Sequence, residues 1–548
     1  MSWEFFVHHY SKDEERDWKY RPEHQGVFYP RAGTLGGCTA HNAMITIVPH
    51  DDDWNAIAEQ TGDDSWRAEE MHRYFEKLEN CHYRKQDEWP KPKGHGFGGW
   101  LNVNAVDPSI AFGDRQIIAT VMDAWRSTLG KFGWLRHMLP RIVHFLITRD
   151  DPNDARNRAM SEGMTVVPLA TTKKGRRNGT REFIKQVQEQ HRDTFHIRMN
   201  HLATRVLFDS DRRAVGVECW EGKNLYRADP NAVEKPPYVK REYRCSREVI
   251  LAGGAFNTPQ LLMLSGIGPK EHLESKGIPC LVDRRGVGSN LQDRYEVSVV
   301  STVTRDFELL KNATFQSPKE GEAGDLCFQE WQKGSGVYTS NGTVTAIIKR
   351  SKKRKERPLP DLFIFGLPGK FVGYVPGYSQ DMVKRHNYFT WAILKAHTEN
   401  RGGKIRLKSS NPLETPDINF HYFEEGTDRA GEDLQSVVEA VRYVRAMNKG
   451  NRWIAEELNP GPKVPDEALA KWIQDNAWGH HASCSCPMGK ESDPDAVVDS
   501  RFRVIGTKGL RVVDASVFPR IPGLFIVTPI YMISEKAADV IIADANNN

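Results

Sequence analysis

The stretch EVILAGGAFNTPQLLMLSGIG (residues 248–268) carries the strongest structural pattern in the chain. It opens with the short apolar run Val249–Ala252, which is typical of a buried strand in a parallel sheet. Gly253-Gly254 permits a tight turn, and Thr258-Pro259 offers a helix N-cap followed by a proline at the first helical position. The pattern predicts a strand, a glycine turn and a helix that ends at Ser265-Gly266, which is the repeating unit of an α/β fold.

A second segment has the same character. LRVVD (510–514) is a short apolar strand that ends on an aspartate. Because ligands of open α/β sheets bind at the carboxyl ends of the strands, Asp514 is predicted to lie beside a ligand. Elsewhere, the segments 203–208 and 214–220 predict a hairpin with a polar turn, and apolar spacing over 65–79 predicts an amphipathic helix.

The central stretch, about residues 300–475, has a different texture. It contains longer loops, strand-like pieces at 389–394 and 404–407, and a helical pattern over 434–447. A chain of 548 residues is long enough for two lobes. We therefore interpret this stretch as a second lobe that is inserted into the first and closes over it.

Composition narrows the function classes. Hydrophobic residues at 39% and aromatic residues at 10% indicate a globular protein. Lysine and arginine total 76 against 72 acidic residues, so net charge does not favour nucleic acid as a partner. Eight irregularly spaced cysteines favour a reduced, cytoplasmic location, and no apolar run is long enough to cross a bilayer.

Two segments allow a second interpretation. The basic run KRSKKRKER (349–357) could bind nucleic acid, but it holds no interleaved aromatic residues, so a solvated loop is favoured. The segment FGWLRHMLPRIVHFLI (132–147) could lie on a membrane surface. Pro140 divides it into two short helices, which favours a cap over a substrate channel.

The stretch WGHHASCSCPMG (478–489) places two histidines just before a Cys-x-Cys. Structural zinc sites usually combine two separated ligand pairs, and no second pair exists elsewhere, so we expect no metal here. Cys484 and Cys486 are then expected to be buried small hydrophobic residues. Taken alone, His481 is either a hydrogen-bonded core histidine or a catalytic base. His480, its neighbour, is expected to point elsewhere and to be structural.

Five motifs together resemble one family. They are PRAGTLGGCTAHN (30–42), GAFNTPQLLMLSGIGP (254–269), GVGSNLQD (286–293), HASCSCPMG (481–489) and RVVDASVFPRIPG with EKAAD (511–539). In this order and at this spacing, the chain resembles the glucose-methanol-choline (GMC) flavoprotein oxidoreductases over nearly its whole length.

The chain departs from the family pattern at several points. The family opens with a strand and a GxGxxG turn that cradles the FAD pyrophosphate, whereas this sequence begins near the family's Asp-Trp, here Asp17-Trp18. We expect that the printed sequence lacks this first βαβ unit; the alternative is a protein that binds FAD poorly. Gly33 replaces a usual basic residue, Arg294 a usual histidine, and Val527 the usual second histidine or asparagine of the last motif.

The resemblance implies an α/β fold with a doubly wound FAD-binding lobe and an inserted α+β substrate lobe. The FAD-binding lobe would comprise residues 1–55, 170–298 and 476–548, and the substrate lobe residues 56–169 and 299–475. The implied reaction is the oxidation of an alcohol to a carbonyl by hydride transfer to FAD, with His481 as general base. The alcohol itself and the electron acceptor are not readable from the sequence.

The residues that match the family's flavin-contacting motifs are Arg31, Leu35, Gly36, Gly37, Cys38, His41, Asn42, Ala43, Gly254, Asp514, Ala515, Thr528 and Pro529. The turn GGCTAHN also resembles that of choline oxidase, a family member whose flavin is bound covalently through a histidine at the position of His41. Covalent and non-covalent binding both stay open here.

Other functions stay open as well. Because Val527 removes one polar partner of the base, a lyase or cyclase without net redox chemistry is an alternative, as is a fragment without cofactor. For an oxidising enzyme, the same substitution predicts a dehydrogenase that uses an acceptor other than oxygen.

Overall fold

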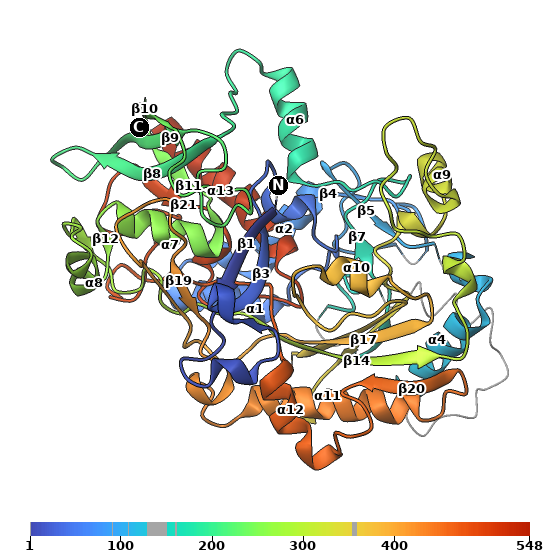
Figure 1. Cartoon of the computed structure of the whole chain (residues 1–548). Coiled ribbons are helices and arrows are strands. Elements are labelled where there is room, and N and C mark those ends of the chain that lie inside the picture. The colour runs from blue at the N-terminus through green and yellow to red at the C-terminus, as the bar shows by residue number, and fades with distance from the viewer. Residues whose placement is uncertain are drawn as a thin grey trace.

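The computed structural model describes residues 2–89, 91–107, 109–128, 151–158, 162–352 and 359–547. The segment 132–147 lies outside these residues, as does most of the basic run 349–357. Figure 1 shows two unequal parts, one around a small parallel unit and one around a broad antiparallel sheet. No described helix meets the length and hydropathy needed to span a membrane.

The parallel unit is formed by the two apolar segments that the sequence singled out. Strand β11 (Val249–Leu251) pairs in parallel with β21 (Leu510–Val512). Helix α7 (Gly254–Leu264) follows β11, and helix α13 (Val527–Asn547) completes the chain after β21. The predicted strand, turn and helix are thus confirmed.

Two details of this prediction are wrong. Helix α7 begins at Gly254, so Pro259 lies inside it. A proline has no N–H for the carbonyl of Ala255, and the Ser485 hydroxyl donates to that oxygen instead at 2.6 Å. Strand β11 is also not buried throughout, because Ile250 is 45% exposed on the uncovered face of this two-stranded sheet.

The second part is built on a six-stranded antiparallel sheet. Its order is β20 (Ile454–Asn459), β14 (Tyr295–Val303), β17 (Tyr388–Lys395), β16 (Leu362–Leu367), β15 (Thr345–Lys349) and β6 (Gly163–Thr165). Helix α11 (Glu432–Asn448) packs against β14, β16 and β17, with α12 (Leu469–Asn476) beside it (Figure 1). Six of these strands and helices derive from the central stretch, and the two-lobe boundaries stay a prediction.

Smaller sheets surround these two parts. The predicted hairpin is confirmed as β8 (His201–Phe208) and β9 (Ala214–Glu221), extended by β10 (Val239–Arg244). Strand β3 (Gly26–Ala32) lies between β1 (Ser2–Val7) and β2 (Tyr20–Arg21), and β5 (Leu101–Ala105) lies between β4 (Glu79–Cys81) and β7 (Pro168–Leu169). Two further pairs are β12 (Ile267–Gly268) with β13 (Val282–Asp283) and β18 (Lys404–Arg406) with β19 (Asp417–Asn419).

The remaining helices lie around the sheets. The helix predicted over 65–79 is α2 (Ala68–Leu78), whose Met71, Phe75 and Leu78 are buried. The others are α1 (Asp51–Thr61), α3 (Ser109–Phe112), α4 (Arg115–Thr128), α6 (Thr180–Gln190), α8 (Lys270–Ser275), α9 (Leu326–Lys333) and α10 (Tyr378–Met382).

Candidate active site

A cavity of about 1220 Å³ lies between the parallel unit and the six-stranded sheet. The parallel unit contributes the turn after β11 and residues at the end of β21, and the sheet contributes residues of β6, β14, β15, β16 and β17. The cavity therefore lies at the carboxyl ends of the parallel strands, where α/β folds bind their ligands. Two walls of this cavity differ in the kinds of side chain that form them.

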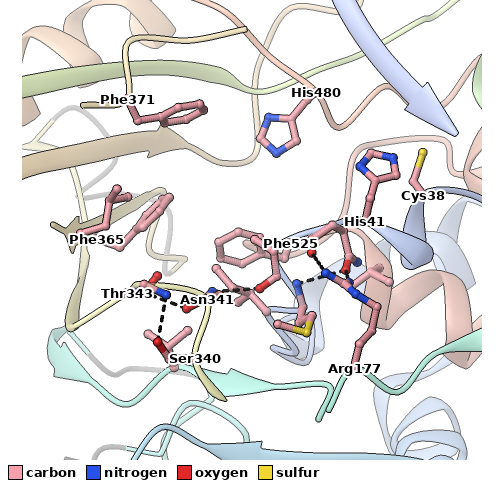
Figure 2. Close-up of a pocket in the computed structure, with 18 of the residues that line it drawn as sticks. Cys38, His41, Arg177, Ser340, Asn341, Thr343, Phe365, Phe371, His480 and Phe525 are labelled. Atoms are coloured by element: carbon pink, nitrogen blue, oxygen red, sulfur yellow. Dashed lines mark hydrogen bonds between the residues drawn. The ribbon is translucent and has the colours of Figure 1, made fainter. Parts of the chain in front are cut away.

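The first wall, here called the histidine wall, comprises Arg31, the turn 37–43 and residues 480–482. The turn includes a short 3₁₀ helix, Gly37–Ala40, and Gly37 has φ +56°, in the left-handed region that favours glycine. Arg177 braces this turn, because its guanidinium donates to the carbonyl oxygen of Thr39 and to both the side-chain and backbone oxygens of Asn42. Figure 2 shows this brace at the edge of the cavity.

Cys38 and His41 lie together in this turn (Figure 2). Burial raises the pKa of the Cys38 thiol, but the Arg31 cation and a hydrogen bond with His41 lower it more, to about 6. The Arg31 guanidinium is 3.8 Å from the sulfur. The histidine wall therefore holds a thiol that is largely ionised at neutral pH beside an imidazole.

The two histidines of the segment 478–483 are held by backbone pairing. Trp478 exchanges both backbone hydrogen bonds with Glu296, and Ser483 does so with Gln292. This pairing fixes the histidines against the start of β14. The prediction that His480 points away is wrong, since both His480 and His481 line the cavity.

A buried clamp holds the backbone of His481. Asp293 accepts a hydrogen bond from the His481 N–H at 2.8 Å and from the Tyr29 hydroxyl at 2.6 Å. The same hydroxyl accepts from the Ala482 N–H at 2.9 Å. Gly479 is required beside this clamp, because a Cβ there would lie 2.5 Å from the Asp293 carboxylate. Tyr29 lies on strand β3, and Asp293 lies just before strand β14. Together they fix the backbone at His481 and Ala482.

His481 is buried without a hydrogen bond to its Nδ1 from the described residues. Burial lowers its pKa well below 6.5, and nearby His480, Arg294 and Arg31 lower it further. Arg294, which replaces the usual histidine of the family, is itself fully buried, and burial lowers its pKa to about 10. His481 is therefore neutral at neutral pH and able to accept a proton.

Glu296 is a buried carboxylate that also lines the cavity. Its Oε1 lies 3.1 Å from His480 Nδ1 and 4.0 Å from His481 Nδ1. Neither contact has hydrogen-bond geometry, and this oxygen has no hydrogen-bond donor among the described residues. A buried carboxylate oxygen without a donor is costly unless a cation compensates it.

The second wall, here called the aromatic wall, consists of Phe365, Phe371, Tyr374, Tyr378 and Phe525. Tyr374 packs edge-on against His480 at 5.0 Å between ring centroids, and against Phe371 at 5.4 Å. Figure 2 shows Phe371 and His480 facing the cavity from the same side. Burial raises the pKa of Tyr374 well above 10, so its ring stays neutral.

The residues predicted to contact flavin divide into two groups. Those that line the cavity are Arg31, Gly37, Cys38, His41, Asn42, Ala43, Gly254, Asp514 and Ala515. Leu35, Gly36, Thr528 and Pro529 are not among the lining residues, whereas their neighbours Ile526, Val527 and Ile530 are.

Asp514 has a structural task as well. Its Oδ2 accepts hydrogen bonds from the Gly254 N–H at 2.9 Å and the Thr258 hydroxyl at 2.6 Å, and its Oδ1 accepts from the Ser516 N–H. Asp514 therefore ties the two turns of the parallel unit together. Cys484 and Cys486 are buried as expected, and burial raises the pKa of Cys484 to about 12.

Comparison with known proteins decides the family. Two GMC oxidoreductase family models match residues 22–296 and 398–534. Mitochondrial choline dehydrogenase of Mus musculus is 30% identical over 541 residues, covering 96% of this chain and 79% of that protein. Oxygen-dependent choline dehydrogenase of Staphylococcus aureus is also 30% identical, covering 96% of this chain and 83% of that protein. The chain belongs to the GMC oxidoreductase family.

Solved structures agree with the fold. The Aspergillus oryzae formate oxidase R554K variant superposes with a TM-score of 0.76 at 22% identity, over 100% of this chain and 89% of that one. A fungal aryl-alcohol oxidase superposes with a TM-score of 0.71 at 20% identity, over 99% of this chain and 90% of that one. As a GMC oxidoreductase, the protein is an FAD-dependent enzyme that oxidises CH–OH groups.

The cavity of this GMC oxidoreductase fits a flavin. At both Gly37 and Gly254, a Cβ would have no neighbouring atom within 4 Å, so the backbone there faces open space that a planar ring can approach. Gly254 also has φ +83°, which favours glycine. The apolar residues Ile526, Val527 and Ile530 offer a third surface around the same space.

Four site residues were missed by the sequence analysis: Arg177, Glu296, Tyr29 and Asp293. Asp293 lies in the quoted motif GVGSNLQD, and Glu296 follows three residues later. The motif could have indicated both. Arg177 and Tyr29 are brought to the site only by tertiary packing, and no local pattern marks them.

Proposed function

We propose that this GMC oxidoreductase oxidises an alcohol that carries a quaternary ammonium group, with His481 as the base. The observation that supports the proposal most is the buried carboxylate of Glu296, whose Oε1 has no hydrogen-bond donor among the described residues and lies 4.0 Å from His481 Nδ1. The relatives whose names include choline dehydrogenase act on such an alcohol.

The proposed chemistry places the proton on His481. Bound FAD supplies the hydride acceptor. The neutral imidazole of His481 takes the hydroxyl proton of the alcohol, which requires that its pKa lie low enough for the free base to dominate. Asp293 and Tyr29 hold the backbone of His481, so that its ring keeps one position through the reaction.

The cation would lie between Glu296 and the aromatic wall. A quaternary ammonium group has no N–H to donate, and it is bound by negative charge and by aromatic faces. Glu296 provides the charge, and Tyr374 and Phe371 provide the rings. A neutral alcohol of the same shape would leave the Glu296 carboxylate without a compensating positive charge.

A comparison of two alcohols tests this proposal. Choline and its neutral isostere 3,3-dimethylbutan-1-ol are assayed with the flavin-loaded enzyme and an artificial electron acceptor. We expect kcat/KM to favour choline by about 10- to 100-fold, the scale of a desolvated charge contact. Glu296→Gln should remove most of this preference, whereas Asp107→Asn, at an exposed carboxylate that also lines the cavity, should preserve it. Equal kcat/KM values for the two alcohols would refute the cation site.

We also propose that the enzyme is a dehydrogenase. Val527 lines the cavity where many family members carry a polar residue, so the site has one fewer group to handle protons. With choline as substrate, an artificial acceptor should support faster turnover than air-saturated buffer. Hydrogen peroxide formed at the same rate as the product would show an oxidase instead.

His41 is expected to contact the flavin, since it lines the cavity in the turn 37–43. Contact alone and a covalent bond are separated by acid precipitation of the flavin-loaded enzyme. Flavin retained in the pellet of the native protein but not of His41→Ala would show a bond. Flavin released wholly into the supernatant would show contact without one.

A further inference from the structure

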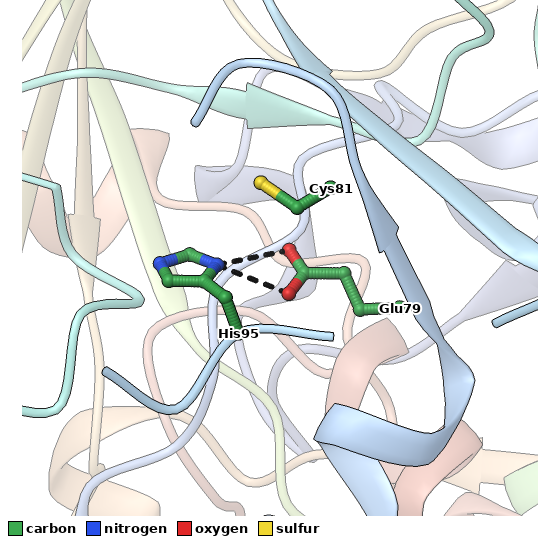
Figure 3. A group of neighbouring side chains, drawn as sticks. All are labelled: Glu79, Cys81 and His95. Carbon is green, nitrogen blue, oxygen red and sulfur yellow. Dashed lines mark hydrogen bonds and ion pairs between the residues drawn. The ribbon is translucent and has the colours of Figure 1, made fainter. Parts of the chain in front are cut away.

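Outside the active-site walls, Glu79, Cys81 and His95 form a buried group, here called the Glu79–Cys81–His95 cluster (Figure 3). Glu79 and Cys81 lie two residues apart on β4, so the alternation of a strand puts both side chains on one face. His95 reaches the same point from the segment before β5. One donor atom of each residue lies within 4.8 Å of the other two.

The second nitrogen of His95 has a carboxylate partner. Its Nδ1 lies 3.0 Å from Glu79 Oε2, and its Nε2 lies 3.1 Å from Asp151 Oδ2, at ion-pair distance but without hydrogen-bond geometry. Asp151 is itself held by the Tyr83 hydroxyl and the Asn153 N–H. A histidine that binds a metal through one nitrogen usually donates the other N–H to such a carboxylate, which fixes the ring.

We propose that the Glu79–Cys81–His95 cluster is a zinc site, with Asp151 orienting His95. A thiolate, an imidazole and a carboxylate are ligands that zinc accepts, whereas magnesium and calcium prefer oxygen ligands alone. Zinc bonds of about 2.0 Å in tetrahedral geometry separate two ligands by roughly 3.3 Å. The 3.0 Å between His95 Nδ1 and Glu79 Oε2 therefore needs only a small expansion.

The charge of the site also balances. A divalent ion displaces the proton that His95 shares with Glu79 and the proton of the Cys81 thiol. The ion then meets two negative ligands, Glu79 and Cys81, so the net charge of this buried region does not change. With three protein ligands, the fourth position remains for water or a backbone oxygen.

The position of the cluster suggests what the ion does. Tyr83, Arg84 and Asp151 line the main cavity, and all three are attached to the cluster through β4 or through His95. Zinc would therefore fix this side of the cavity. The site takes no part in the hydride transfer.

Cadmium tests the proposal, because its thiolate complexes absorb in the ultraviolet. The flavin-loaded full chain is stripped of metal with a chelator and titrated with Cd²⁺. We expect a thiolate charge-transfer band that saturates at one equivalent, that is lost in Cys81→Ser, and that persists in Cys219→Ser. Cys219 is the matched control, as a buried cysteine of β9.

Zinc binding provides the second readout. Metal analysis after gel filtration should find one zinc per native chain and less than a tenth of that in Cys81→Ser, with both proteins showing the same flavin spectrum. Asp151→Asn should weaken zinc binding by about 10- to 100-fold, the usual effect of losing a ligand's orienting carboxylate.

Three results would overturn the zinc site. The native protein could show no thiolate band, or Cys81→Ser could show the same band as the native protein. Alternatively, bound zinc could survive Cys81→Ser and disappear in His480→Gln. That last result would place the ion at Glu296, His480 and His481, whose donor atoms also lie within 4.8 Å of one another.

Discussion

The histidine wall and the aromatic wall face the same cavity but are built in opposite ways. The histidine wall is a set of short turns whose backbone is pinned by buried polar groups, such as Asp293 under His481. The aromatic wall consists mainly of side chains from a sheet and its loops, held by ring packing. Hydrogen bonds to buried polar groups fix the positions of individual atoms, whereas packed aromatic rings fix the shape of a surface. The first arrangement suits chemistry and the second suits recognition.

This contrast predicts that the first wall governs kcat and the second governs KM. The largest effect should come from His481→Ala. Loss of a general base lowers turnover by about two to four orders of magnitude. Flavin content should stay unchanged, which a visible spectrum of the purified variant checks. Normal turnover of His481→Ala together with loss of turnover in His480→Ala would show that His480, and not His481, is the base.

Tyr29→Phe should come next. It removes one hydroxyl from the clamp, so the Ala482 N–H loses its acceptor and Asp293 Oδ2 loses the Tyr29 donor. Since a shift of about 1 Å at a reacting group can cost 10²-fold in rate, we expect kcat to fall by about 10- to 100-fold while KM changes little. The matched control is Tyr378→Phe on the aromatic wall. If Tyr29→Phe raised KM and left kcat alone, the clamp would belong to recognition.

Tyr374→Leu removes one ring of the aromatic wall and should act on KM, whereas the changes in the histidine wall act on kcat. Cation–π contacts contribute about 0.5 to 2 kcal/mol, so KM for choline should rise by about 2- to 30-fold. KM for 3,3-dimethylbutan-1-ol should stay nearly constant, because a neutral group gains little from the ring's charge distribution. Steady-state kinetics with both alcohols measure the difference. A parallel rise for both would indicate a shape effect alone.

The smallest effect concerns pH. The pKa of His481 lies well below 6.5, mainly through burial and in part through nearby His480, Arg294 and Arg31. The base is neutral above its pKa, so kcat/KM should be constant above pH 6.5 and should fall only at lower pH. Arg294→Met removes one cation that disfavours the imidazolium, so the pKa should rise and the acid limb should move to higher pH. An acid limb that stays in place would show that Arg294 does not act on His481.

The sequence predicted the histidine wall better than the aromatic wall, for a physical reason. The strand, glycine turn and helix at 248–268 and the aspartate at 514 follow from local pattern, because backbone geometry restricts which residues fit. His481 and the turn 37–43 could be assigned because their motifs resemble a family. Tyr374 and Phe371 carry no such constraint, since many apolar side chains can shape a binding surface. Their role follows only from the register of the sheet and the packing of the loop beside it.

Two of the errors in the sequence analysis show where local rules fail. Pro259 was placed at the start of a helix because a proline lacks an N–H, but Ser485, more than two hundred residues away, supplies the missing donor. His480 was expected to point away because neighbours on a strand alternate, but both rings meet the cavity in this segment. In the first case a long-range contact replaces the missing donor, and in the second residues 479–482 are not in a strand, so the alternation does not apply.

The central claim is that an alcohol reduces the flavin while His481 takes the proton. The most direct test is anaerobic mixing of the flavin-loaded enzyme with choline in a sealed cuvette. The account predicts loss of the visible absorbance of oxidised flavin, one aldehyde product per flavin, and a rate about 10²- to 10⁴-fold lower in His481→Ala. Product formation with an unchanged flavin spectrum would contradict it and indicate chemistry without net oxidation.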